Sequence, residues 1–210
     1  MNPLKRFVEF VEKNWQNREL YIDYCSHKAA VYSVYKWHYS KSMPAGKLVK
    51  FGVWERENFI GSVIFGTGAN FNIGKIVNLT CYEICELVRV ALDKHETPVS
   101  KIVAYCLRKL KRDFPNLKAI ISYADPRQNH KGVIYQAMSW NYLGKTTYAS
   151  HFEKNGKFYH SRTVNQHRRD DKSYDISLFT RIKTWKHKYI YLYDRELFKI
   201  IEKKIEKYPA

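Results

Sequence analysis

Residues 86–135 constrain the fold more than any other stretch, because they read as strand, helix, strand and helix in succession. Apolar residues dominate 86–92 and 119–124, which have the length of strands, and the segment between them repeats apolar residues at helical spacing. Parallel strands joined by a helix end at one edge of a sheet, where α/β proteins bind ligands. The unit therefore predicts an α/β fold with a ligand crevice at that edge.

Two charged residues, Glu86 and Arg89, stand inside the first of these strands. A buried charge is costly unless it is paired, so its presence indicates a site. In a regular strand, residues three apart point to opposite faces, and each then needs its own partner. Arg89 is a candidate for holding a phosphate or the carboxyl oxygens of a donor, and Glu86 for ordering a ligand or acting as a base. A structural salt bridge is the alternative.

Charge and aromatic content indicate the partner. The chain has 37 Lys and Arg against 20 Asp and Glu, a net charge of +17 that is spread over its whole length. Such a surface favours a polyanion through counterion release and steering. The 17 Tyr and five Trp can stack bases while neighbouring cations hold phosphates. Nucleic acid is the predicted partner; a basic soluble protein with aromatics in its core is the alternative.

The cysteines and the hydropathy pattern indicate the compartment. Cys81 and Cys85 are spaced to share a helical face, either as metal ligands or as reduced thiols of a cytosolic protein. The amino terminus has no apolar signal-peptide core, and no apolar run is of membrane-spanning length. We expect an intracellular, cytoplasmic protein with no membrane partner.

The chain shows no repeat, linker or domain break, so a single domain over 1–210 is predicted, with a core at about 30–150 and a basic elaboration at 151–210. Thr97 as N-cap and Pro98 at the first position start the central helix. The other predicted elements are a helix at 3–15, a loop at 37–47, a hairpin of 48–54 and 59–66, a short helix around Tyr82, a helix at 129–139, strands at 142–150 and 157–164 turning at Asn155-Gly156, an aromatic strand at 189–193 and a closing helix at 194–207.

The order of these elements resembles the GNAT acyltransferase fold over roughly residues 30–150. The resemblance implies a mixed central sheet flanked by helices, here with an extra basic hairpin, aromatic strand and C-terminal helix. In GNAT proteins the acyl donor sits where the central strands splay apart, and a Gly-rich loop cradles the pyrophosphate of coenzyme A on a helix amino terminus. The equivalent turn at 93–101 has no glycine. Val99, Ser100 and Lys101 are the candidates for binding the donor there, with capping as the alternative for Ser100.

A more specific resemblance rests on an ordered set of short motifs over about residues 35–193. They are Trp37-His38-Tyr39-Ser40-Lys41-Ser42, Gly46-Lys47, Gly52-Val53-Trp54-Glu55, Gly61, Glu86-Leu87-Val88-Arg89, Thr97-Pro98-Val99-Ser100, Ala124-Asp125-Pro126, Gly132 to Ala137, Asn155-Gly156-Lys157, His160-Ser161-Arg162 and Lys188-Tyr189-Ile190-Tyr191. This set resembles the Mom DNA-modification proteins of Mu-like phages. The resemblance implies a transferase that converts adenine in double-stranded DNA to a carbamoylmethyl form in the host cytoplasm and so protects DNA from restriction. It also implies iron and acetyl-coenzyme A as helpers.

Five residues are the catalytic candidates. His38 and Tyr39, in a matching motif, are read as metal ligands or as a base with a base-stacking partner; packing of His38 on Trp37 is the alternative. Asp125 follows a strand end and is read as a general base or a third metal ligand, with a cap or Asx-turn as the alternative. Tyr135 lies where GNAT enzymes often keep a Tyr that protonates the leaving thiolate, and core packing competes with that role. Glu86 completes the set.

Base flipping is expected, because the adenine amine is paired inside a duplex. Trp37, Tyr39 or Trp54 is predicted to stack the flipped base. Backbone contacts are assigned to the basic residues, with a solvated basic hairpin as the alternative. The nucleic-acid candidates are Trp37, Lys41, His160, Arg162, Arg168 and Arg169.

The donor is left open between acetyl-coenzyme A and glycyl-tRNA. Acetyl transfer would leave an amide on the amine, which is not a carbamoylmethyl group, whereas a glycyl ester leads to the product by rearrangement. Two other functions are considered: a non-catalytic nucleic-acid-binding protein on a GNAT scaffold, and a conventional N-acyltransferase. The missing Gly-rich loop argues against the second.

Overall fold

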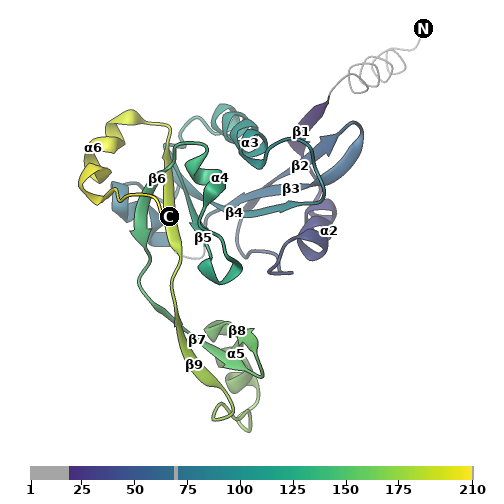
Figure 1. Ribbon diagram of the computed structural model, residues 1–210, viewed down its shortest axis with the longest axis vertical. Coiled ribbons are helices and arrows are strands. Elements are labelled where there is room, and N and C mark those ends of the chain that lie inside the picture. Colours follow the sequence, from purple (N-terminus) through teal and green to yellow (C-terminus); the bar gives the residue numbers. More distant parts are fainter. Residues whose placement is uncertain (1–18, 69–70, 210) are drawn as a thin grey trace.

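A seven-stranded mixed sheet organises the computed structural model, which describes residues 19–68 and 71–209 (Figure 1). The strand order is β1-β2-β3-β4-β5-β10-β6, and β4–β5 is its one parallel pair. The strands are β1 (Leu20–Tyr24), β2 (Leu48–Glu55), β3 (Asn58–Gly66), β4 (Ile84–Leu92), β5 (Ala119–Ala124), β6 (Asn141–Lys145) and β10 (His187–Leu192). The predicted helix at 3–15 lies outside the described residues.

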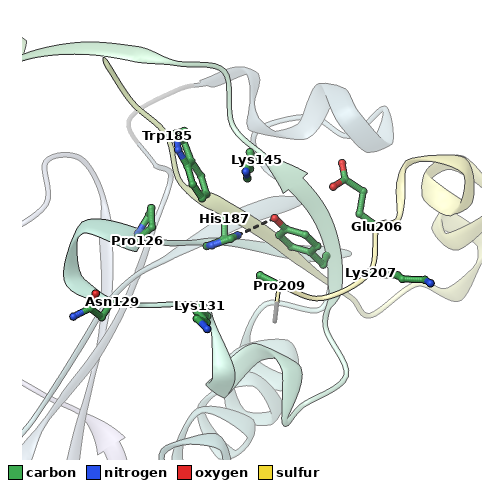
Figure 2. A pocket seen from close by; sticks show the side chains of 10 residues that line it. Pro126, Asn129, Lys131, Lys145, Trp185, His187, Glu206, Lys207 and Pro209 are labelled. Carbon is green, nitrogen blue, oxygen red and sulfur yellow. Dashed lines mark hydrogen bonds between the residues drawn. The ribbon is translucent and has the colours of Figure 1, made fainter. Parts of the chain in front are cut away.

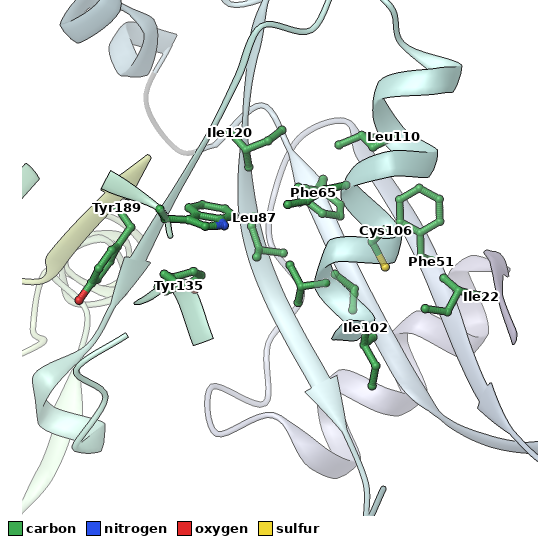
Figure 3. Close-up of a cluster of buried hydrophobic side chains, with 14 of the residues drawn as sticks. Ile22, Phe51, Phe65, Leu87, Ile102, Cys106, Leu110, Ile120, Tyr135 and Tyr189 are labelled. Atoms are coloured by element: carbon green, nitrogen blue, oxygen red, sulfur yellow. The ribbon is translucent and has the colours of Figure 1, made fainter. Parts of the chain in front are cut away.

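Helix α3 (Val99–Asp113) covers one face of this sheet. Its buried residues are the five that helical spacing predicts: Ile102, Val103, Cys106, Leu107 and Leu110. They pack in the main core against Phe51, Phe65 and Leu87 of the sheet (Figure 3). Because α3 supplies the cover between β4 and β5, the strand–helix–strand unit is confirmed.

The opposite face is covered by α2 (His27–Trp37) and, further along, by 3-10 helix η1 (Phe71–Val77) with α6 (Phe198–Ile201). Ser26 caps α2 by accepting a hydrogen bond from the Ala29 N–H at 3.1 Å. Ala30 and Val34 of α2 pack against Ile64 and Ala91 of the sheet. Helix α2 therefore places the loop that follows it beside β4.

The start of α3 differs from the sequence prediction. Its N-cap is Pro98, with no side-chain hydrogen bond, so Thr97 does not cap the helix. The Thr97 N–H instead donates to the Glu55 carboxylate at 2.7 Å. Thr97 thus contacts Glu55 of β2 and does not act as the helix cap that the motif predicts.

Other predicted helices are shorter or absent. Residues 129–139 do not form one helix, because Asn129 (φ +56°) and Gly132 (φ +82°) adopt left-handed conformations that separate η2 (Pro126–Gln128) from α4 (Val133–Gln136). A turn occupies the place of the helix around Tyr82. The closing helix breaks into η3 (Arg195–Leu197), α6 and η4 (Glu202–Lys204).

A second, three-stranded sheet carries the basic segment. It consists of β7 (Ala149–Lys154), β8 (Lys157–Tyr159) and β9 (Thr180–Thr184), with α5 (Ser161–Asp170) beside it. Asn155 and Gly156 both have positive φ and join β7 to β8, which confirms the predicted hairpin. The predicted strands at 142–150 and 157–164 are wrong in extent, since the first divides between two sheets and the second becomes α5 after His160. We call residues 149–184 the small sheet module.

Two chain segments connect the small sheet module to the end of the central sheet (Figure 1). These segments are joined where the Thr146 N–H donates to the Lys186 carbonyl at 2.8 Å and the Lys186 N–H donates to the Thr146 hydroxyl at 2.9 Å. Strands β1 and β10 lie outside residues 30–150 and still belong to the central sheet. Across the described ranges, no helix is long and apolar enough to cross a membrane.

Candidate functional site

A cleft opens where β4 and β5 separate. The two strands pair from Ile84 and Ala119 as far as Leu87 and Ser122, and their pairing ends there. Past that point lies a cleft of about 320 Å³ at the carboxyl ends of both strands. It is lined by His38, Tyr39, Leu87, Val88, Arg89, Val90, Tyr123, Ala124, Asn129, His130, Lys131, Gly132, Val133, Ile134 and Tyr135.

A β-bulge in β4 shapes this cleft. Against β3, Ile64 pairs with Arg89 and Phe65 pairs with Leu87, so Val88 is an additional residue. Because of that residue, positions three apart across the bulge share a face. Leu87 and Val90 accordingly pack in the same core. Glu86 and Arg89 are brought to one face in the same way, and the predicted opposite orientation is wrong.

Arg89 joins the loop after α2 to β4. Its Nε donates to the Ser42 carbonyl at 3.2 Å, and its Nη1 donates to the Val88 carbonyl at 2.7 Å. Burial lowers the pKa of the guanidinium, while Tyr39 and Glu86 act in the opposite direction. The side chain remains a cation that lines the cleft with an orientation fixed by two carbonyls.

His38 is buried at the end of α2, and its Nδ1 is engaged. The Ser40 N–H donates to that nitrogen at 3.1 Å, and the Ser40 hydroxyl lies 2.8 Å from it. Since a backbone N–H can only donate, Nδ1 accepts, and Nε2 carries the proton of the neutral ring. Burial first, then the nearby Arg89 and His130, lowers the pKa of His38 to about 4. At neutral pH, His38 is therefore an uncharged N–H donor in the cleft wall.

This lowered pKa predicts a pH-dependent stability. Unfolded His38 binds a proton near pH 6.5, but folded His38 does not until about pH 4. The contribution of His38 to the free energy of unfolding is complete above pH 6.5. It is lost as the pH drops toward 4, which lowers stability by about 3 kcal/mol. Denaturant unfolding of the parent and of His38→Gln between pH 4 and 8 should show that the variant loses this part of the pH dependence. Parallel curves for the two proteins would contradict the assignment.

Tyr39 lies on the cleft rim, with its ring 4.4 Å from the His38 ring and edge-on to His130 at 5.7 Å. It is 46% exposed, so one side remains available to a ligand. Burial, and secondarily the Asp125 charge, raises the pKa of Tyr39. Asp125 itself caps η2 by accepting from the Arg127 N–H at 3.0 Å, which is the capping alternative that the sequence left open.

Tyr135 closes the bottom of the cleft. The Ser122 hydroxyl donates to the Leu87 carbonyl at 2.8 Å, so the Tyr135 hydroxyl, 2.8 Å from Ser122 Oγ, donates to it. These contacts place the phenol at the point where β4 and β5 part. Burial raises the pKa of Tyr135 to about 12, so it holds its proton at neutral pH.

The predicted donor-binding residues lie elsewhere. Ser100 and Lys101 line a separate pocket of about 460 Å³ between α3 and the end of α4, and Val99 packs against the main core. In the loop before α3, the Glu55 carboxylate accepts from the Glu96 and Thr97 N–H groups at 2.9 and 2.7 Å. The Glu55 carboxylate therefore engages two N–H groups of the loop just before α3.

Among the nucleic-acid candidates, Trp37 packs against Tyr32 and Phe59, and Trp54 also packs on Phe59. Neither Trp lines the cleft, which leaves Tyr39 as the stacking candidate there. Lys41 donates to the Lys36 carbonyl at 2.7 Å. The remaining candidates belong to the small sheet module: His160 lies against His151 at the start of α5, Arg168 and Arg169 are exposed in its last turn, and Arg162 lies in its first turn with its side chain outside the described part.

The described residues do not fit a metal centre. None of their His, Cys, Asp and Glu side chains form a group of three that could hold a metal. His38 uses Nδ1 to accept an N–H, and Asp125 uses Oδ1 as a cap. Cys85 lies in β4 and Cys81 in the turn before it, so they share no helical face; burial raises the pKa of Cys85 to about 12.

Sequence reasoning missed three residues of the cleft region. His130 and Lys131 fall in the segment read as a helix, so their place in a loop was hidden. Ser122 is a lone polar residue in the apolar strand 119–124, and that isolation is a signal that could have identified it. It is 1% exposed and joins Tyr135 to β4.

With this geometry established, comparison with known families matches residues 19–210 to the Mom protein family. The chain belongs to the Mom protein family. Methylcarbamoylase mom of Escherichia phage Mu is 28% identical to it over 132 residues, which cover 61% of this chain and 54% of that protein. The match thus spans about half the length of this curated relative.

Solved acetyltransferases share the fold. The ribosomal-protein-S5-alanine acetyltransferase of Vibrio fischeri aligns with a TM-score of 0.50 at 10% identity, covering 85% of this chain and 95% of its own. An aminoglycoside acetyltransferase solved with coenzyme A aligns with a TM-score of 0.51 at 8% identity, covering 86% and 97%. At this identity the likeness shows the fold alone, and it confirms the predicted GNAT-like mixed sheet.

Proposed function

We propose that this Mom family member is a transferase that modifies adenine in double-stranded DNA, giving a carbamoylmethyl group on the exocyclic amine. The observation that carries the proposal is the family match over residues 19–210, and the similarity to a relative named a methylcarbamoylase supports it. Protection of phage DNA from restriction in the host cytoplasm is the role we expect for the product.

The charge of the cleft supports this reaction. Arg89 and Lys131 contribute cations, and none of the described lining residues is an Asp or Glu. Attack on an ester carbonyl generates an oxyanion, which preorganised N–H donors stabilise. The Nε2–H of His38 and the guanidinium of Arg89 are the donors that we assign to it.

The adenine must leave the duplex to reach the cleft. Tyr39 is assigned to stack it, since this ring lies at the rim with nearly half of its surface exposed. A base held there would present its amine toward Arg89 and Tyr135. The small sheet module, with eight Lys and Arg against four Asp and Glu, is assigned to the DNA backbone.

The position of Glu55 favours a donor other than coenzyme A. Its carboxylate accepts two loop N–H groups just before α3, and these hydrogen bonds hold its pKa below the usual value despite the opposing effect of burial. The carboxylate stays ionised and would repel a pyrophosphate at that helix end. A glycyl ester of tRNA, which needs no pyrophosphate cradle, is the donor that we propose.

The glycyl route gives the product without an oxidant. The adenine amine attacks the glycyl carbonyl, loses one proton as the C–N bond forms, and releases the tRNA ribose oxygen, which gains one proton. The glycyl amine then attacks the ring carbon and gives up one proton, which forms a five-membered spiro intermediate. Cleavage of the bond from that carbon to the original nitrogen leaves ring–NH–CH2–CO–NH2, and the departing nitrogen takes up the proton. Tyr135 is assigned to protonate the leaving ribose oxygen, and its hydroxyl must turn from Ser122 Oγ to do so.

The test compares donors. Pure protein is incubated with duplex DNA and either glycyl-tRNA, uncharged tRNA with free glycine, or acetyl-coenzyme A, and the nucleosides are analysed by mass spectrometry. Carbamoylmethyl adenine should form with glycyl-tRNA alone. Product with acetyl-coenzyme A alone would refute the glycyl route, and unmodified adenine under every condition would favour a non-catalytic binding protein.

DNA binding should depend strongly on salt. Each phosphate contact contributes about 0.9 to the slope of log affinity against log salt. Arg168→Ala with Arg169→Ala should therefore lower the slope by about 2, because both side chains are exposed in the last turn of α5. Replacing Lys199 and Lys203, near the chain end, removes the same charge and should leave the slope nearly unchanged. Equal slopes for both double variants would place the DNA path elsewhere.

A further inference from the structure

A second pocket lies beside the cleft, at the base of the small sheet module (Figure 2). Its volume is about 470 Å³. Strands β5, β6 and β10 reach it at one end of the sheet, where His187 pairs with both Ala124 and Lys145. The lining residues on which the argument depends are Asn129, Lys131, Tyr142, Lys145, Trp185 and His187.

The pocket combines an aromatic ring with cations. The half-buried Trp185 indole has the Lys145 amine 4.4 Å from its centroid and the His187 ring 4.8 Å away, edge to face (Figure 2). Lys131 is a second exposed cation on the lining. The described lining holds three Lys and one Glu, so it is net positive. An aromatic face beside amines is the arrangement that binds a base and its phosphates.

Buried partners hold this aromatic wall in place. The Tyr142 hydroxyl lies 2.8 Å from His187 Nδ1, within hydrogen-bond distance (Figure 2). Both residues are at most 5% exposed. Burial, with Lys145 and Lys131, lowers the pKa of His187, so the ring is neutral at pH 7 and contributes no charge. The cationic groups are therefore the lysines, and Trp185 rests on a fixed support.

One loop separates this pocket from the cleft. Asn129 and Lys131 line both cavities. The Tyr189 hydroxyl donates to the Lys131 carbonyl at 2.5 Å and so fixes the loop between them. The pocket and the cleft are therefore neighbours that share the loop of Asn129 and Lys131.

We infer that this pocket binds an unpaired nucleotide, with its base against Trp185 and its phosphates on Lys131 and Lys145. Resting on the proposed function, we assign this nucleotide to the 3′ end of the donor RNA. The flipped adenine must occupy the cleft itself. The nucleotide that carries the ester must therefore be bound directly beside the cleft. The neighbouring pocket meets that requirement.

The test uses a fluorescently labelled RNA trinucleotide CCA, the DNA trinucleotide of the same sequence, and a DNA duplex, each titrated against full-length protein. Trp185→Ala should weaken RNA trinucleotide binding about 10-fold or more, because stacking supplies much of the affinity. Trp185→Phe, which keeps an aromatic face, should stay within about 3-fold of the parent. Duplex affinity should not change in either variant.

Lys145→Ala provides a second readout that does not depend on folding of the Trp185 variant, since Lys145 is exposed. It should weaken trinucleotide binding several-fold, while Lys199→Ala, which removes an exposed amine on α6, should not. If Trp185→Ala and Lys145→Ala both bind the trinucleotide as tightly as the parent, the assignment of this pocket as a nucleotide site is refuted. Tighter binding of the DNA trinucleotide than of the RNA would overturn the donor assignment. Because these assays measure binding alone, Trp185-dependent RNA binding by a protein that modifies no adenine would refute the proposed reaction and keep the pocket.

Discussion

Replacing Tyr135 by Phe is expected to reduce the rate of adenine modification by about 100- to 10,000-fold, the usual contribution of a positioned acid or base. The variant removes one oxygen at the bottom of the cleft, 2.8 Å from Ser122 Oγ. With a pKa raised to about 12, the phenol keeps its proton at neutral pH, as a donor to a leaving ribose oxygen requires. Single-turnover kinetics with saturating donor should show the loss in the chemical step.

The structure should tolerate this change. Ser122 continues to donate to the Leu87 carbonyl, so the variant loses one hydrogen bond, worth about 1 kcal/mol. Tyr193→Phe is a matched control: its hydroxyl donates to the Leu107 carbonyl at 2.7 Å, outside the cleft. It should cost similar stability and leave the rate within about 3-fold. If Tyr135→Phe and Tyr193→Phe have equal rates, Tyr135 is a packing residue only.

The fold could be predicted where its determinants are local. The apolar strands around 86–92 and 119–124, the hairpin after Lys47 and the buried face of α3 each follow from spacing within one segment. The placement of β10 between β5 and β6 could not be predicted, because the residues of β10 and β5 that pair are about 70 positions apart in the sequence. The bulge at Val88 was hidden for the same reason, since only the register with β3 reveals it.

The same distinction between local and non-local determinants applies to the site. His38, Tyr39, Arg89 and Tyr135 were selected by residue type and motif, and the structure brings all four to one cleft. Their roles remain predictions. Thr97 was misread because Glu55, far away in sequence, competes for its N–H. Trp37 and Trp54 were selected as base-stacking residues by type, but both pack on Phe59 and neither lines the cleft. Sequence identifies which residues carry chemistry, whereas non-local contacts decide which are available for it.

Arg89→Lys should reduce modification by about 10- to 100-fold while duplex affinity stays near that of the parent. The guanidinium donates to two carbonyls, from the Ser42 loop and from the bulge at Val88, and still lines the cleft. A Lys amine has three donors on a flexible stem and cannot reproduce that planar geometry. Loss of one charge-assisted hydrogen bond to the oxyanion, about 1.5 to 3 kcal/mol, accounts for the expected decrease.

Three measurements separate the donor role of Arg89 from a structural one. The melting temperature should fall by a few degrees at most, because the cation is kept and only backbone hydrogen bonds are weakened. The Michaelis constant for glycyl-tRNA or the turnover number should change, whereas duplex binding should not. Lys109→Arg, on α3 where the largely covered Lys109 amine pairs with the Asp23 carboxylate of β1, makes the reverse exchange outside the cleft and should leave the rate unchanged. Unfolding of Arg89→Lys, or full activity in it, would make Arg89 a structural link between the Ser42 loop and β4, and the oxyanion would then have to be bound by His38 without it.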